Sequence, residues 1–388
     1  MRVYFYCRDE PFNLQEDVVT IAEGLKDIGI PFHGSCNYWL QSAEPGDYLI
    51  RHDPEIRPDD CDVVVVSYTW SVFMRPGSFD VLERPLPEGL FKKGRRYTTV
   101  CMDNHDGHRT VSWEPEYRQF DLILRSKLNR RAWHPENMRP WVLGFTNRIV
   151  EATSGAPAFA DRRRVVLVNF GASHPYGHGA RTEAAKVFLP ELEKQVPIDT
   201  SKDDLKCKPE DSYDLILWEQ TGMRFSRSYY ERLKTSRAVA CFCGELIPPM
   251  PWKDPGQYLV GGNKARLKRK FFDTLARFDP RPARSVQWDS FRAWEAWVAG
   301  CATINLDLDL YGAELPMMPE NWKHYIGVDL ANPTRALDRL RDDPGVLERV
   351  ASAGREWAMQ HYAPSAMAWR FLEYLGADLS RRDQGRGA

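Results

Sequence analysis

Short apolar runs, typical of buried strands, alternate along the chain with segments in which apolar residues recur at helical spacing. The clearest run is C-D-V-V-V-V-S-Y at residues 61–68, and such continuous branched residues are typical of parallel sheets covered on both faces. Residues 2–7 predict a strand, and residues 16–27 predict a helix. Two further strands are expected at 96–102 and 120–125. The first half of the chain therefore predicts a doubly wound α/β layer.

The second half repeats this pattern after a run of small residues at 151–161, which is typical of a linker. Strands are expected at 163–171, 213–218, 238–242 and 302–306, with a basic helix at 265–278, a short helix at 291–299 and helices over 333–375. We therefore expect an α/β fold with two Rossmann-like domains that face each other across a cleft. The expected boundaries are 1–150 for the first domain, 151–162 for the linker, 163–362 for the second domain, 363–376 for a C-terminal helix and 377–388 for a disordered polar tail.

Composition limits the kinds of partner that we expect. The chain has 388 residues, a formal net charge of −1 and a pI near 6.8, so it carries no overall field that would attract nucleic acid or an acidic membrane. We therefore predict a small or neutral partner and no nucleic acid. The sequence shows no signal peptide and no apolar window long enough to span a membrane, and its cysteines have no C-x-x-C spacing. These features favour a cytoplasmic protein with reduced thiols.

The stretch F-R-A-W-E-A-W-V-A-G-C places a single acid, Glu295, on an otherwise apolar helix. Asp289 and Ser290 are positioned to cap this helix, and its N-terminus is a favourable place for phosphate. A nucleotide whose diphosphate meets Ser290 and Phe291 would bring its ribose to Glu295, where a carboxylate can accept from two vicinal hydroxyls. The alternative is a surface ion pair of Glu295 with Arg292.

The motif W-E-A-W-V-A-G-C, followed by an apolar strand, Y-G, L-P and P-E-N-W-K-H-Y, resembles the donor-binding half of GT-B glycosyltransferases. The likeness is to the group-1 type and its spore-maturation-protein-like relatives, over about residues 165–375. It implies that the second domain binds a nucleotide-sugar donor, with ribose on Glu295, and that the first binds the acceptor. Many retaining members carry a glutamate where this chain has Gln287, which weakens a retaining assignment. The C-terminal helix is expected to return to the first domain.

Three further groups are donor-binding candidates. Lys264 and Arg266 follow two glycines in the basic run 261–270, and a cation there commonly neutralises the donor diphosphate in this family. His174, His178 and Arg181 lie in a glycine-containing turn after the strand that begins near residue 163. Asp307, in the D-L-D motif with Asp309, is placed to accept from sugar hydroxyls. A solvated basic face and a polar interdomain loop are the alternatives for the first two groups.

In the first domain, V-C-M-D-N-H-D-G-H-R-T brings polar groups together after a predicted strand. Asp103 or Asp106 is a candidate general base for an acceptor hydroxyl, and His105–Asp106 is similar to an H-D pair of group-1 enzymes whose histidine touches the transferred sugar. A zinc site including His108 is disfavoured because the ligands are crowded into one loop, and a structural loop network is the other alternative. Residues 128–141, rich in Arg, Trp and Pro, suit either the acceptor side or interdomain packing.

These features predict a metal-independent glycosyltransferase with no cofactor, since the nucleotide sugar is its substrate. Its acceptor would be a glycan, a lipid-linked sugar or a small molecule, and polysaccharide or glycoconjugate synthesis is the common use of such enzymes. A sugar-nucleotide epimerase with the same fold and a noncatalytic nucleotide- or glycan-binding protein are the alternative functions.

Overall fold

The computed structural model describes residues 1–9, 16–74, 81–105, 115–171, 179–201, 207–248, 271, 274, 278 and 283–386. The first domain is built on a six-stranded parallel sheet in the order β11-β9-β8-β5-β1-β2. Its strands are β1 (Val3–Tyr6), β2 (Phe32–Gly34), β5 (Val63–Val66), β8 (Thr98–Asp103), β9 (Leu122–Ser126) and β11 (Met138–Trp141). All four valines of β5 are buried, which confirms that both faces of this central strand are covered.

One face of the first sheet is covered by α1 (Glu16–Asp27), which has the bounds expected from the sequence. Its residues Val18, Ile21 and Leu25 are fully buried. The remaining regular elements of this domain are short: α2 (Tyr68–Ser71), α3 (Asn147–Ala152), and the antiparallel pairs β3 (Tyr38–Leu40) with β4 (Tyr48–Ile50) and β6 (Val72–Met74) with β7 (Val81–Glu83).

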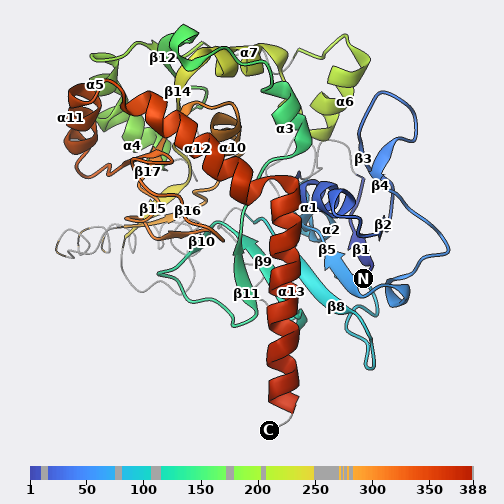
Figure 1. Ribbon diagram of the computed structural model, residues 1–388. Coiled ribbons are helices and arrows are strands. Elements are labelled where there is room, and N and C mark those ends of the chain that lie inside the picture. The colour runs from blue at the N-terminus through green and yellow to red at the C-terminus, as the bar shows by residue number, and fades with distance from the viewer. Residues whose placement is uncertain are drawn as a thin grey trace.

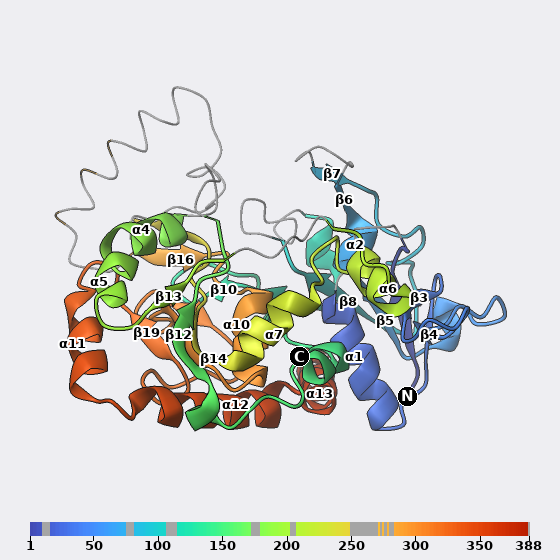
Figure 2. The same ribbon diagram turned by 90° about the horizontal axis from the view of Figure 1, so that it is seen from above.

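The second domain has a five-stranded parallel sheet in the order β13-β12-β14-β17-β19. Its strands are β12 (Arg163–Leu167), β13 (Ile198–Asp199), β14 (Ser236–Ala240), β17 (Ala302–Leu306) and β19 (Ile326–Val328). Around it lie α4 (Gly179–Val187), α5 (Leu189–Glu193), α7 (Arg227–Thr235), α10 (Phe291–Val298), α11 (Thr334–Asp342) and the antiparallel pair β15 (Glu245–Ile247) with β16 (Arg284–Val286). Helix α6 (Ser212–Gln220) lies against the first domain instead, where the side chain of Gln220 bonds to the backbone of Leu40 (Figure 2). The prediction of an α/β protein with two Rossmann-like sheets is therefore confirmed.

One predicted strand is wrong: residues 213–218 belong to helix α6. The carboxylate of Asp211 accepts from the backbone N–H groups of Tyr213 and Asp214, at 3.0 and 2.9 Å, and so caps the N-terminus of this helix. The continuous apolar run suggested a buried strand, whereas the cap just before it is the signal for a helix.

The C-terminal helices return the chain to the first domain. Helix α12 (Val346–Tyr362) leads into α13 (Pro364–Arg386), which packs along α1, as Figure 1 shows for the red helix beside the blue one. Gly24 permits this approach, because a Cβ there would lie 1.9 Å from the carbonyl oxygen of Pro364. The expected disorder of the tail is wrong as far as Arg386, since α13 continues to that residue.

The two domains also meet through a short antiparallel strand pair, β10 (Leu128–Asn129) with β18 (Ala313–Glu314). The buried side-chain amide of Asn129 donates to the carbonyl oxygens of Ser285 and Tyr311, both at 2.9 Å. Figure 2 shows the two sheets side by side, with α10 and α7 in the second domain lying toward the first. Segment 128–141 therefore contributes to interdomain packing, the second of its two interpretations.

Candidate functional site

Helix α10 is fixed in the core by its aromatic face. Trp294 is fully buried and packs on the rings of Trp357 and Tyr362, with ring centroids 6.1 and 4.7 Å away. Ser290 is the N-cap residue, but its side chain makes no capping hydrogen bond. The carboxylate of Asp289 instead accepts from the backbone N–H of Leu143, at 2.6 Å, and from the indole N–H of Trp294, at 2.7 Å. Asp289 therefore ties the start of α10 to the first domain and is not its cap.

Glu295 is half-buried on the flank of α10, and both of its carboxylate oxygens accept hydrogen bonds from neutral groups. The hydroxyl of Tyr229 donates to Oε2 at 2.7 Å, and the hydroxyl of Tyr230 donates to Oε1 at 2.9 Å. The surface ion pair with Arg292 is not formed among the described residues, because the Arg292 guanidinium lies over the ring of Phe170 at 5.6 Å. Within the described ranges, no cationic side chain pairs with this carboxylate.

Arg292 occupies the first turn of α10, where the helix dipole disfavours a cation. Its Nη1 is buried and has no hydrogen-bond partner among the described residues, and the nearby Ser290 hydroxyl is also buried without one. A guanidinium nitrogen that is buried without a partner beside a helix N-terminus would be stabilised by an anionic ligand. The sequence suggested Arg292 only as a surface ion-pair partner, although a cation in a first helical turn was a signal of this kind.

The turn after β12 lies mainly outside the described residues, and so do His174 and His178. Arg181 is described: its Nε donates to the carbonyl oxygen of Phe242 at 3.1 Å, and its guanidinium lies 5.7 Å from the ring of Phe170. Arg181 and Arg292 therefore both contact the same phenyl ring. The N-terminus of α4 is already occupied by a carboxylate, because Glu245 accepts from the backbone N–H of Gly179 at 2.8 Å. This arrangement disfavours a phosphate at α4 and leaves α10 as the better anion site.

Lys264 and Arg266 also lie outside the described residues. Of the basic helix expected at 265–278, Phe271 and Phe278 are described and both are exposed.

Asp307 is engaged within its own loop. One carboxylate oxygen accepts from the backbone N–H of Leu310 at 3.0 Å, and the other accepts from the side-chain amide of Asn321 at 2.9 Å. These bonds hold the loop after β17, and the role of Asp307 in accepting from sugar hydroxyls stays a prediction. Asp309 is exposed and pairs across the domain boundary with Arg130 at 2.8 Å.

In the first domain, Asp103 forms a buried ion pair with Arg125. The same carboxylate oxygen accepts from the backbone N–H of His105 at 3.0 Å, which fixes the turn after β8. These bonds give Asp103 a structural role in the turn, and its assignment as a general base stays a prediction. His105 is buried beside it, whereas Asp106 and His108 lie outside the described residues.

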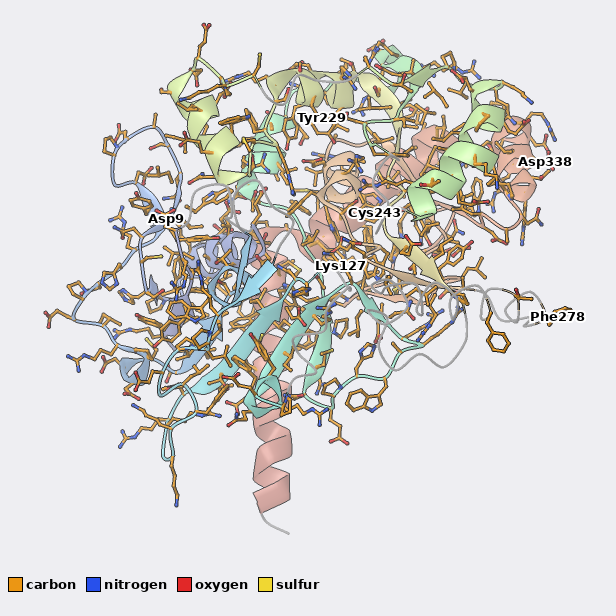
Figure 3. All side chains as sticks on the ribbon, turned by 180° about the vertical axis from the view of Figure 1, so that it is seen from behind. Asp9, Lys127, Tyr229, Cys243, Phe278 and Asp338 are labelled. Atoms are coloured by element: carbon orange, nitrogen blue, oxygen red, sulfur yellow. The ribbon has the colours of Figure 1, made fainter. Side chains whose placement is uncertain are left out.

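The structure adds Asp17, Asn104 and Lys127 to this region, none of which the sequence pattern indicated. Burial raises the pKa of Asp17 to about 6, against the opposing effects of its hydrogen bonds and of Lys127. The ammonium of Lys127 donates to the carbonyl oxygen of Asn104 at 3.2 Å, and Figure 3 places Lys127 near the middle of the molecule. A carboxyl group with a pKa near neutrality can exchange protons at physiological pH, which makes Asp17 a candidate acid or base.

Two classes of feature are absent from the described residues. No helix in these parts of the chain is long and apolar enough to cross a membrane. Within the same ranges, no group of three or more His, Cys, Asp or Glu side chains is arranged to hold a metal ion.

The sequence matches no family model and no curated protein. The fold, however, is similar to solved structures of an alpha-glucosyltransferase. One, in complex with UDP and a 13-mer DNA containing a HMU base, is 11% identical with a TM-score of 0.51, over 97% of this chain and 99% of that one. Another, in complex with UDP, is 10% identical with a TM-score of 0.50, over 97% and 100%. A glycosyltransferase from Rickettsia africae is 9% identical with a TM-score of 0.48, over 97% and 98%.

The prediction that nucleic acid is not a partner is contradicted by this comparison. The alpha-glucosyltransferase that shares this fold was solved with DNA bound. A net charge near zero therefore does not exclude nucleic acid from the partners of such a chain. The comparison confirms the predicted fold. The two parallel sheets and the returning C-terminal helix form the fold of GT-B glycosyltransferases.

Proposed function

We propose that this protein is a glycosyltransferase that moves a sugar from a nucleotide-sugar donor to an acceptor hydroxyl. The observation that carries the proposal is Glu295, a half-buried carboxylate on the flank of α10 that is held by two hydroxyls and has no cationic partner in the part of the chain that the structure describes. Vicinal ribose hydroxyls can donate to the remaining lone pairs of its two oxygens. The alpha-glucosyltransferase with this fold was solved with UDP, which is consistent with a nucleotide-binding second domain.

The diphosphate of the donor would lie at the N-terminus of α10. Arg292 and the Ser290 hydroxyl, both with buried atoms that lack partners, would bind its oxygens there. A guanidinium can donate two parallel hydrogen bonds to a phosphate and would stabilise the charge that develops on the leaving diphosphate. Phe291 begins the same turn, while Lys264, Arg266, His174 and Arg181 stay candidates for further donor contacts.

The acceptor would bind the first domain, near the end of β8. His105 and Asp106 stay our candidates there for contact with the transferred sugar and for proton removal, and Asp17 joins them because of its raised pKa. A metal-independent reaction in the cytoplasm and a role in polysaccharide synthesis also stay proposals.

Turnover with nucleotide sugars tests the proposal. The purified protein is incubated with UDP-, GDP- and ADP-sugars, with and without acceptors, and the released nucleoside diphosphate is measured. The acceptors include oligosaccharides and a 13-mer DNA containing a HMU base, because DNA of that kind was bound to the alpha-glucosyltransferase. Nucleotide release that requires an acceptor and is lost in Glu295→Gln supports the proposal. The matched control is Glu193→Gln, because Glu193 is an exposed residue at the end of α5.

Two results would contradict the transfer reaction. Isomerisation of the donor sugar without any acceptor would identify an epimerase. Binding of a nucleotide sugar with no reaction under any condition would identify a noncatalytic binding protein.

A further inference from the structure

A continuous chain of hydrogen bonds leads from Glu295 out of the second domain. The hydroxyl of Tyr230 donates to Glu295 and accepts from Nη1 of Arg148, with both distances 2.9 Å. Nη2 of Arg148 then donates to both carboxylate oxygens of Glu16, at 2.7 and 2.9 Å. The four residues come from α10, α7, α3 and α1. This series of hydrogen bonds therefore ends on the first helix of the first domain.

Every link of this chain is shielded from water except Glu295 itself. Arg148, Glu16 and Tyr230 are 7%, 6% and 4% exposed. The Arg148 guanidinium lies 5.9 Å from the ring centroids of both Phe225 and Tyr230. Both terminal nitrogens of this buried guanidinium are paired, and a rearrangement would break these bonds and leave the charge buried without them.

Tyr229 holds the second oxygen of Glu295. Its hydroxyl donates to Oε2 at 2.7 Å, and its ring lies edge-on to that of Tyr230 with centroids 5.2 Å apart. Figure 3 labels Tyr229 on α7, whose two adjacent tyrosines thus bond to the two oxygens of one carboxylate. The rotation of the Glu295 carboxylate is fixed by these two bonds.

The protonation states of these side chains fix which group donates and which accepts in each hydrogen bond. Burial raises the pKa of both tyrosines well above the ordinary value, so both hydroxyls stay protonated and act as donors to Glu295. Burial alone would lower the pKa of Arg148, but the charge and hydrogen bonds of Glu16 raise it above its ordinary value. Arg148 therefore stays charged and donates to Tyr230, which polarises the Tyr230 hydroxyl toward Glu295.

We propose that Tyr229 and Tyr230 are positioning residues for recognition of the donor ribose. Each takes one lone-pair site on one oxygen of Glu295, which leaves one site on each oxygen directed to the two vicinal hydroxyls of a ribose. Arg148 fixes Tyr230 from the first domain, so ribose recognition in the second domain depends on the contact with Glu16. This inference rests on the proposed function of Glu295.

The test compares affinity for a nucleoside diphosphate with affinity for its 2′,3′-dideoxy form. A merely structural role for the tyrosines would weaken both ligands equally, whereas a positioning role weakens only the ligand that has ribose hydroxyls. The probes are UDP and 2′,3′-dideoxy-UDP, with GDP and ADP and their dideoxy forms used where one of these binds more tightly. Calorimetric titration gives the ratio of the two dissociation constants for each variant.

The variants are Tyr230→Phe, Tyr229→Phe, Arg148→Lys and Glu295→Gln. The matched control is Tyr311→Phe, because Tyr311 is also buried in the second domain and donates to a carboxylate, that of Asp329, at 3.0 Å. Circular dichroism establishes that each variant is folded before titration. Tyr229→Phe keeps the test valid if Tyr230→Phe does not fold, because Arg148 bonds to the hydroxyl of Tyr230 and the hydroxyl of Tyr229 bonds to Glu295.

The proposal predicts that the wild type and Tyr311→Phe prefer the ribose form, and that Glu295→Gln loses this preference. Tyr230→Phe and Tyr229→Phe should each reduce the preference by about tenfold, the effect of one charge-assisted hydrogen bond. Arg148→Lys should reduce it less, because an ammonium can keep the contact with Glu16. An unchanged preference in both tyrosine variants, with the preference lost in Glu295→Gln, would overturn this inference and leave the proposed function intact. A wild type that binds none of the nucleotides, or does not distinguish the two forms, would overturn both.

Discussion

Glu295 in the second domain and Asp103 in the first are both carboxylates held by side chains of their own domain, but their partners differ in kind. Asp103 is buried and paired with the guanidinium of Arg125. Glu295 is half-buried and held by two neutral tyrosine hydroxyls. An ion pair neutralises a carboxylate, whereas hydroxyls orient one and leave its charge available. Asp103 is therefore suited to support the fold, and Glu295 is suited to bind a ligand.

Removal of Arg125 from its ion pair with Asp103 should have the largest effect on the free energy of unfolding. Arg125→Met leaves the Asp103 charge buried without its partner, and we expect a loss of about 3–5 kcal/mol in the free energy of unfolding. Urea unfolding measures this loss. The double variant Asp103→Leu/Arg125→Met removes both charges and should be more stable than the single variant. A single variant as stable as the wild type would show that the pair does not support the fold.

A third carboxylate, Asp17, sharpens the comparison because burial dominates its environment and raises its pKa to about 6. The folded protein therefore binds this proton more tightly than the unfolded chain, whose aspartates titrate near pH 4. The resulting stability is complete below about pH 4 and is lost as the pH rises through 6.

Asp17→Asn should accordingly match the wild type at pH 4 and exceed its free energy of unfolding at pH 7.5 by up to about 3 kcal/mol. The difference between the two proteins at each pH is the quantity to measure, since other groups titrate in both. Equal stability of the two proteins at pH 7.5 would mean that Asp17 is not penalised by burial.

The exposed pair of Arg130 and Asp309 should show the smallest effect. Asp309 is 72% exposed, and a solvated ion pair contributes about 0.2–1 kcal/mol. Asp309→Asn should therefore change the free energy of unfolding by less than about 1 kcal/mol, and the change should shrink in 1 M salt. A larger loss that persists in salt would show that this pair helps to hold the two domains together.

The periodicity of the sequence was sufficient for the two sheets but not for every element. The valine run of β5 and the amphipathic pattern of α1 are local signals, and both elements form as expected. The run at 213–218 was misread because buried helices and strands can share an apolar composition, and here the cap at Asp211 decided the outcome. The tail to Arg386 is helical although its composition suggested disorder.

The candidate site was predictable only in part, because its contacts join residues far apart in sequence. Glu295 stood out from its apolar surroundings, but no local pattern pairs it with Tyr229 and Tyr230, about one-sixth of the chain away. Asp103 was noticed for its place after a strand, while its partner Arg125 comes from the neighbouring strand of the sheet. Pairing between side chains of different elements decides which polar groups remain available for a ligand. The periodicity of the sequence carries no information about this pairing.

Calorimetric titration of the wild type and Glu295→Gln with UDP, GDP and ADP tests the central claim most directly. We predict that one of these nucleotides binds the wild type and that the substitution weakens it by at least about tenfold, because the charge that accepts from the ribose is lost. The exposed Glu193→Gln should bind as the wild type does. Equal affinity of the wild type and Glu295→Gln, or no binding of any of the three nucleotides, would contradict the assignment of α10 as the donor site.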